Sequence, residues 1–165
     1  MKRSLTGLAD AWLYNYTDFG EGRDQSSRPV LRATVPVSAP GSRRSFSAII
    51  DTGGPINLVS TAFIETAPAA VPTDERLILR LGGRRFDAPV VTIAVALHPT
   101  VPSPAAPRLW TGLAAVIDPW PHEGTAVIFS QTGFLDQFTV TFGPQGFAVE
   151  DGSTFAARFS GAPGS

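Results

Sequence analysis

The stretch from Ser47 to Ser60 reads SAIIDTGGPINLVS and contains an Asp-Thr-Gly triplet at Asp51, Thr52 and Gly53. Two isoleucines precede the triplet, and an apolar run follows it. By itself the triplet is typical of a polar β-turn, because Asp and Gly are common turn residues. Apolar runs on both sides instead predict two buried strands that are joined by a tight loop. The flanks therefore favour a carboxylate held at the end of a buried strand.

This segment resembles the active-site segment of aspartic proteases, in which apolar residues lead into Asp-Thr-Gly and a short strand ending in Ser follows. Only one apolar-flanked triplet occurs in the 165 residues. A single copy is similar to the retroviral (retropepsin-like) type, in which two identical chains each give one aspartate. The resemblance implies that Asp51 is catalytic. It also implies that Thr52 forms a bond across a homodimer, which holds the two Asp-Thr-Gly loops together. Gly53 would leave the backbone enough space for the tight loop.

A second segment, from Ala126 to Phe142, resembles the late part of retropepsin-like domains. In that family a strand crosses behind the catalytic loop, and a short helix with a Phe-Leu pair and a closing strand follow. We expect this helix from 133 to 138, because the spacing of its apolar residues gives it one apolar face. The runs 139–142 and 146–150 predict a hairpin.

One position departs from the family pattern. Ser130 stands where the family has glycine, and Phe129 stands where leucine is usual. A side chain at residue 130 is expected to crowd the catalytic loop, so that activity is less firmly implied than the fold. The competing hypothesis is a retropepsin-like protein that binds peptide or serves as a scaffold without cleaving. A third reading is a β-barrel interaction module with an accidental triplet.

The resemblance covers most of the chain and implies three parts: a lead-in at 1–27, a retropepsin-like domain at 28–150 and a tail at 151–165. The implied fold is all-β, with one or two short helices, and forms one closed, β-barrel-like half of an acid protease. Sixteen glycines and fifteen prolines suit short strands and frequent turns. The lead-in up to Tyr16 is expected to be helical or irregular.

Local sequence signals predict the strands and the short helix of the rest of the domain. We expect strands at 29–37, 45–50, 57–60, 75–81, 86–97 and 110–117, and a short helix that Ser60 or Thr61 caps. Gly82 and Gly83 join two of these strands. By family resemblance this hairpin would be a flap that folds over a substrate, since glycines tolerate the backbone changes of a moving lid. The pair is equally typical of an ordinary hairpin turn.

The charge and the composition of the chain limit the classes of partner that we expect it to bind. The net charge is −1, and the pairs Arg43-Arg44 and Arg84-Arg85 adjoin turn residues. These pairs are interpreted as solvated hairpin tips, so nucleic acid is not an expected partner. The expected partners are a peptide or protein substrate and a second copy of the chain. The ratio of twelve arginines to one lysine, with abundant Ala, Pro and Gly, hints at a GC-rich bacterial genome.

The sequence gives little support for a metal site, a cofactor site or a serine-hydrolase site. The chain has no cysteine, and His98 and His122 lie far apart in sequence, so neither a metal site nor a cofactor is expected. Ser60 has no histidine in a triad pattern, and Asp118 before proline is interpreted as a turn residue. No apolar stretch reaches the roughly 18 residues that span a bilayer. Polar residues interrupt the segment after Met1-Lys2-Arg3, so that a cytoplasmic location is expected.

Overall fold

The computed structural model describes residues 12–18, 31–100 and 107–153, and these residues are mostly β-strand. The all-β class expected from the sequence is thereby confirmed. One short helix, α1 (Thr61–Ile64), lies in the described part of the chain. Ser60 caps it as expected, since its hydroxyl accepts a hydrogen bond from the Phe63 amide at 3.2 Å.

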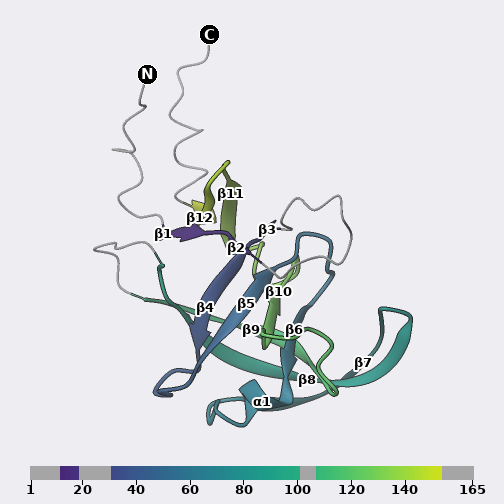
Figure 1. Cartoon of the computed structure of the whole chain (residues 1–165). Coiled ribbons are helices and arrows are strands. Elements are labelled where there is room, and N and C mark those ends of the chain that lie inside the picture. The colour runs from purple at the N-terminus through teal and green to yellow at the C-terminus, as the bar shows by residue number, and fades with distance from the viewer. Residues whose placement is uncertain (1–11, 19–30, 101–106, 154–165) are drawn as a thin grey trace, which may run out of the picture.

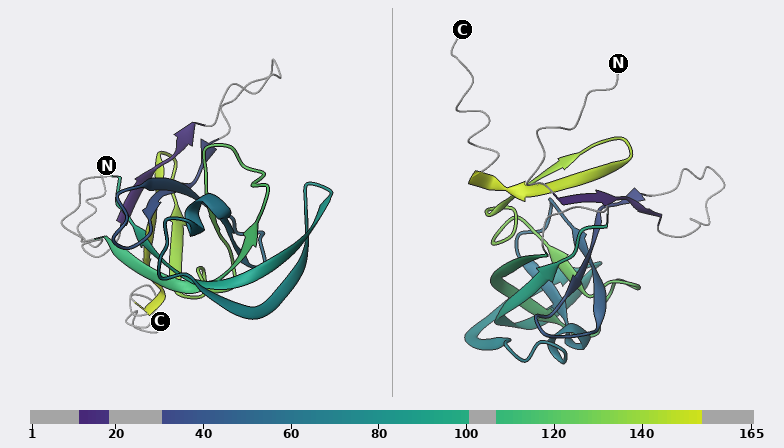
Figure 2. Two further views of the ribbon diagram at one scale, coloured as in Figure 1. Left: turned by 90° about the horizontal axis from the view of Figure 1, so that it is seen from below. Right: turned by 90° about the vertical axis from the view of Figure 1, so that its left-hand side faces the viewer.

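Seven strands form the larger sheet, in the order β4-β5-β10-β6-β9-β8-β7. Their bounds are β4 (Thr34–Ser38), β5 (Ser45–Ile50), β6 (Asn57–Ser60), β7 (Val71–Leu81), β8 (Arg84–Leu97), β9 (Arg108–Ile117) and β10 (Val127–Phe129). β8, the last strand but one in this order, also pairs with the first strand, β4. The paired residues are Val37 with Leu97 and Ser38 with Ala96. Six strands therefore close into a ring, and β7 continues from β8 outside it (Figures 1 and 2).

The two strands that flank the Asp-Thr-Gly triplet do not pair with each other. β10 lies between them, parallel to β5 and antiparallel to β6. Ile128 pairs with Ile49 on one side and with Leu58 on the other. The segment expected to cross behind the triplet is thus hydrogen-bonded to both of its neighbours, which fixes the two ends of the loop.

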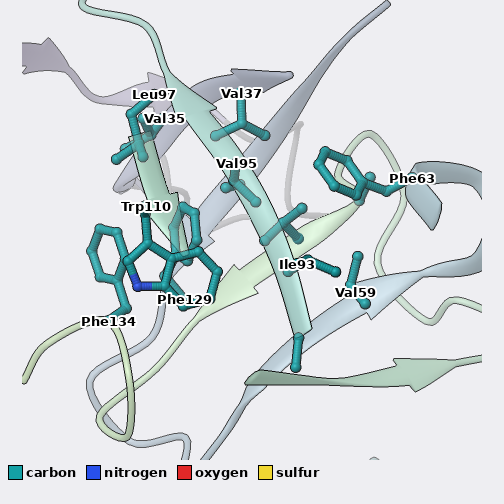
Figure 3. Packing of buried hydrophobic residues seen from close by; sticks show 14 of the residues in the cluster. Val35, Val37, Val59, Phe63, Ile93, Val95, Leu97, Trp110, Phe129 and Phe134 are labelled. Atoms are coloured by element: carbon teal, nitrogen blue, oxygen red, sulfur yellow. The ribbon is translucent and has the colours of Figure 1, made fainter. Parts of the chain in front are cut away.

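The main core fills the inside of the ring. Alternate residues of the strands point inward, as the period of two requires, and they pack in one cluster that has Trp110, Phe129 and Phe134 on one side (Figure 3). Phe129 and Phe134 stack with ring centroids 4.0 Å apart, and the Trp110 ring meets Phe129 edge-on at 5.2 Å. The Trp110 indole N–H donates to the Gly133 carbonyl oxygen at 2.9 Å. Each of these buried aromatic side chains contributes about 2–3 kcal/mol through burial alone.

A smaller sheet with the order β1-β12-β11 lies at one end of the ring (Figures 1 and 2). It consists of β1 (Trp12–Asn15), β11 (Phe138–Phe142) and β12 (Gly146–Asp151). β11 and β12 form the expected hairpin. The expectation of a helical or irregular lead-in is wrong for residues 12–15, because they pair with β12. Tyr14 is buried there and stacks on Phe147 at 5.1 Å. The start of the lead-in lies outside the described residues.

The expected helix at 133–138 is also wrong, since these residues form turns that lead into β11. Gly133 has a φ of +95°, which no α-helix accommodates. The Phe134 carbonyl oxygen accepts the amides of both Gln137 and Phe138 at 3.0 Å, so only a single tight turn forms. The apolar spacing did identify buried residues, because Phe134 and Phe138 both enter the core.

The two remaining strands, β2 (Thr17–Asp18) and β3 (Leu31–Arg32), pair with each other. The loop expected between them lies outside the described residues. β7 begins at Val71, earlier than expected, and its register with β8 shifts between Pro72 and Arg76. Such an irregularity accommodates a proline at the edge of a sheet. No helix in the described part of the chain has the length and apolar character that crossing a membrane requires.

Candidate active site

Asp51 directly follows the last residue of β5, and its side chain is exposed. Its backbone amide donates to the Phe129 carbonyl oxygen of β10 at 2.8 Å. The carboxylate is also held, because its Oδ1 accepts the Gly53 amide at 2.9 Å. A fixed carboxylate therefore faces solvent at the end of β5.

The segment after β10 supports the loop from behind. The Gln131 side-chain amide donates to the Thr52 carbonyl oxygen at 2.7 Å. Its backbone amide donates to the Gly54 carbonyl oxygen at 3.1 Å. Thr52 and Gly53 are exposed like Asp51, so all three residues of the triplet lie on the surface of this chain.

Asn57, the first residue of β6, ties three segments together. Its side chain is fully buried. The amide nitrogen donates to the carbonyl oxygens of Leu113 at 3.0 Å and Thr132 at 2.9 Å, and Oδ1 accepts the Ser130 amide at 2.8 Å. The sequence analysis did not single this residue out. The signal was present, because asparagine is depleted in strands and here it interrupts an apolar run.

Replacing Asn57 by Ala is expected to lower the free energy of unfolding by about 3 kcal/mol or more. The change leaves the buried Ser130 amide without its acceptor and removes the donor from two part-buried hydrogen bonds, and each such loss costs about 1–3 kcal/mol. Urea denaturation measures the effect. The matched control is Gln137→Ala, since the exposed Gln137 amide also donates to a carbonyl oxygen, that of Gly133. A loss below about 0.5 kcal/mol is expected for the control, and equal losses for both variants would contradict the role of Asn57.

Ser130 lies beneath the loop and is buried, with 1% of its surface exposed. Its hydroxyl adjoins Gly54, where an added Cβ would lie 2.4 Å from Ser130 Oγ. The expected crowding of the loop by residue 130 is thus avoided, because the facing residue has no side chain.

A hollow of about 710 Å³ opens beside Asp51. Its apolar wall residues come from β5, from β10 and from the end of β11. The lining residues are Tyr16, Ala33, Ile49, Ile50, Asp51, His122, Ile128, Phe142, Gly143 and Pro144. The Tyr16 hydroxyl donates to the Gly143 carbonyl oxygen at 2.7 Å, which ties the β11–β12 turn to this wall. Sequence reasoning missed Tyr16, His122 and Phe142, because no local pattern joins such distant segments.

Gly82 and Gly83 form the two-residue turn between β7 and β8. Both have positive φ, +55° and +80°, which is the conformation that a type I′ hairpin turn requires. Neither glycine lines the hollow beside Asp51. One face of the hairpin, with Leu79 and Phe86, packs in a second apolar cluster that also contains Ile128 from the wall of the hollow. The hairpin is therefore connected to the site through packing, and a flap role stays a prediction.

The other titratable residues of the described ranges do not gather around Asp51, apart from Tyr16 and His122 in the wall of the hollow. His98 hydrogen-bonds to the Ser38 hydroxyl at 2.9 Å. Of the two histidines, only His122 borders the hollow. Asp118 is an exposed turn residue. Within the described ranges, no group of three His, Asp or Glu side chains is placed to hold a metal ion.

No model of a known protein family matches the chain, and no curated protein is significantly similar to it. A functional argument for this chain therefore depends on the geometry of the site and on the sequence motif.

Proposed function

We propose that the chain is an aspartic endopeptidase of the retropepsin type, in which two copies each contribute Asp51. The observation that carries this proposal is the held, solvent-facing carboxylate of Asp51 at the edge of an apolar hollow. Its Oδ1 is fixed by the Gly53 amide at 2.9 Å, and its backbone is fixed by β10. The position of β10 between the two strands that flank the triplet also supports the proposal.

The chemistry follows from two carboxylates that approach each other. They cannot both ionise cheaply at close range, so the pair holds one proton. The ionised member takes a proton from a water molecule, which attacks the peptide carbonyl carbon. The protonated member donates a hydrogen bond to the oxyanion that develops. In this scheme, Thr52 links the two loops and the hollow receives an apolar side chain of the substrate.

A second copy of the chain would bind at the edge of β11 that is unpaired among the described residues. β11 has one edge that pairs with β12, and its other edge pairs with no strand in the described part of the chain. Phe142 at its end is 50% exposed and lines the hollow beside Asp51. An isologous pairing at this end of the molecule would bring two Asp51 side chains toward one axis.

A non-cleaving, peptide-binding protein is the alternative. The feature that favours it is the departure of Ser130 from the glycine of the family pattern. Both proposals use the same hollow, and they differ in whether a bound peptide is hydrolysed.

The test is cleavage of a peptide library across the pH range. The expected result is hydrolysis with an optimum below about pH 6, since the reaction needs one proton on the carboxylate pair. Activity is expected to fall at lower pH, where both groups are protonated, and at higher pH, where both are ionised. Mass spectrometry of the products measures the rate at each pH.

The control is the same assay with a chelator, which should leave the rate unchanged. A rate that is constant from about pH 4 to pH 9 would contradict a shared-proton mechanism, as would a rate that the chelator abolishes. Binding of the library without cleavage at any pH would favour the alternative.

A further inference from the structure

Ser130 carries a buried polar atom without a partner. Its backbone is fixed, since its amide donates to Asn57 Oδ1 at 2.8 Å. Its hydroxyl oxygen is inaccessible to solvent and makes no hydrogen bond. Leaving a buried hydroxyl unpaired costs free energy, and such groups call for a functional explanation.

The hydroxyl shares a small space with the Asp51 carboxylate. A Cβ built on Gly54 would lie 2.4 Å from Ser130 Oγ and 3.2 Å from Asp51 Oδ2, so both oxygens border the position that this atom would occupy. Gly54 has no positive φ, so its backbone does not require glycine. A side chain at residue 54 would therefore collide with Ser130.

The two facing groups are complementary. Asp51 Oδ1 already accepts the Gly53 amide, whereas Oδ2 accepts no hydrogen bond from the described residues. A serine side chain can exchange between staggered rotamers, and its hydroxyl proton rotates to suit an acceptor. An ionised carboxylate is the stronger acceptor, and hydrogen bonds to it are stronger than neutral ones.

We propose that Ser130 is a positioning residue for Asp51. The Ser130 hydroxyl turns toward the space that Gly54 leaves open and there donates a hydrogen bond to Asp51 Oδ2. The contact fixes the carboxylate at both oxygens and favours its ionised form. Its catalytic consequence rests on the proposed peptidase function, but the contact itself can be measured without any cleavage.

The first measurement is the titration of the Asp51 carboxyl carbon by NMR, with its signal identified by its absence in Asp51→Asn. Ser130→Ala is expected to raise the titration midpoint by about one pH unit, because the donor to the ionised form is lost. The double variant Gly54→Ser/Ser130→Gly returns a hydroxyl to the same space and is expected to restore most of the shift.

The matched control is Ser60→Ala, which removes another buried serine hydroxyl that instead accepts from the Phe63 amide. This variant is expected to lose stability without moving the midpoint of Asp51. A midpoint that Ser130→Ala leaves unchanged would overturn the proposal, and so would an equal shift in Ser60→Ala.

The second measurement is the thermal stability of a double-mutant cycle. Gly54→Ala is expected to lower Tm by several degrees, because its Cβ collides with Ser130 Oγ. In the Ser130→Gly background the same change is expected to leave Tm unchanged or to raise it, since Ala reduces the entropy of the unfolded chain. Equal losses in the two backgrounds would refute the shared space.

The results of the titration and of the double-mutant cycle do not depend on whether the chain is a peptidase. If the wild type cleaves no peptide, the titration and the cycle still report the contact. If the wild type cleaves and both measurements fail, the peptidase stands without the Ser130 contact. If both hold, the acid limb of the pH–rate profile should move upward by about one pH unit in Ser130→Ala.

Discussion

Replacing Asp51 by Asn is expected to reduce peptide cleavage by about 10³-fold or more while the fold stays intact. Asn cannot take a proton from water at any working pH, so the pair loses its base. The fold should survive because Asp51 is exposed, and an Asn oxygen can still accept the Gly53 amide. The stability change should stay within about 0.5 kcal/mol. Cleavage kinetics and urea denaturation measure the two effects.

Asp74→Asn is the matched control, because Asp74 is an exposed carboxylate on β7, away from the hollow. It is expected to cleave at the wild-type rate. Wild-type activity in Asp51→Asn would remove the basis of the aspartic-peptidase proposal, and a comparable loss in both variants would point to a general effect of charge.

The second large effect concerns dimerisation. One chain holds one Asp-Thr-Gly triplet, and a single carboxylate cannot act as base and acid in the same step. Specific activity should therefore fall on dilution below the dimer dissociation constant. Thr141→Lys is expected to raise that constant by about tenfold or more, equal to about 1.4 kcal/mol. Thr141 is exposed on β11, and a lysine on an edge strand opposes pairing with another edge.

Thr111→Lys serves as the control, since Thr111 is an exposed strand residue of β9 and lies outside the small sheet. Sedimentation equilibrium and activity are measured over the same range of concentrations. Full activity from a monomeric species would rule out the shared site. A stable dimer without cleavage would favour the peptide-binding alternative.

Local patterns were sufficient for the parts of the fold that depend on neighbouring residues. The apolar run before Asp51 predicted β5, and the glycines at 82–83 predicted the β7–β8 turn. Ser60 predicted the start of α1. Each of these elements depends on backbone preferences within a few residues, which the sequence displays directly.

The spacing of apolar residues predicted secondary structure less reliably where a turn or a strand competes with a helix. Phe134, Leu135 and Phe138 have helical spacing, yet the positive φ of Gly133 begins a turn that ends in β11. The lead-in gave no strand pattern, and residues 12–15 become a strand because β12 offers a free edge to pair with. Tertiary pairing outweighed local propensity at residues 12–15.

The sequence by itself determined that the chain is mainly β and that Asp51 follows a strand at the start of a glycine loop. Only the tertiary structure decided what surrounds this carboxylate. The insertion of β10 between β5 and β6, the Asn57 hydrogen bonds and the facing of Ser130 and Gly54 join residues more than fifty positions apart. No local pattern encodes such contacts, because they depend on strand register and on the volume of side chains that meet only when the ring closes.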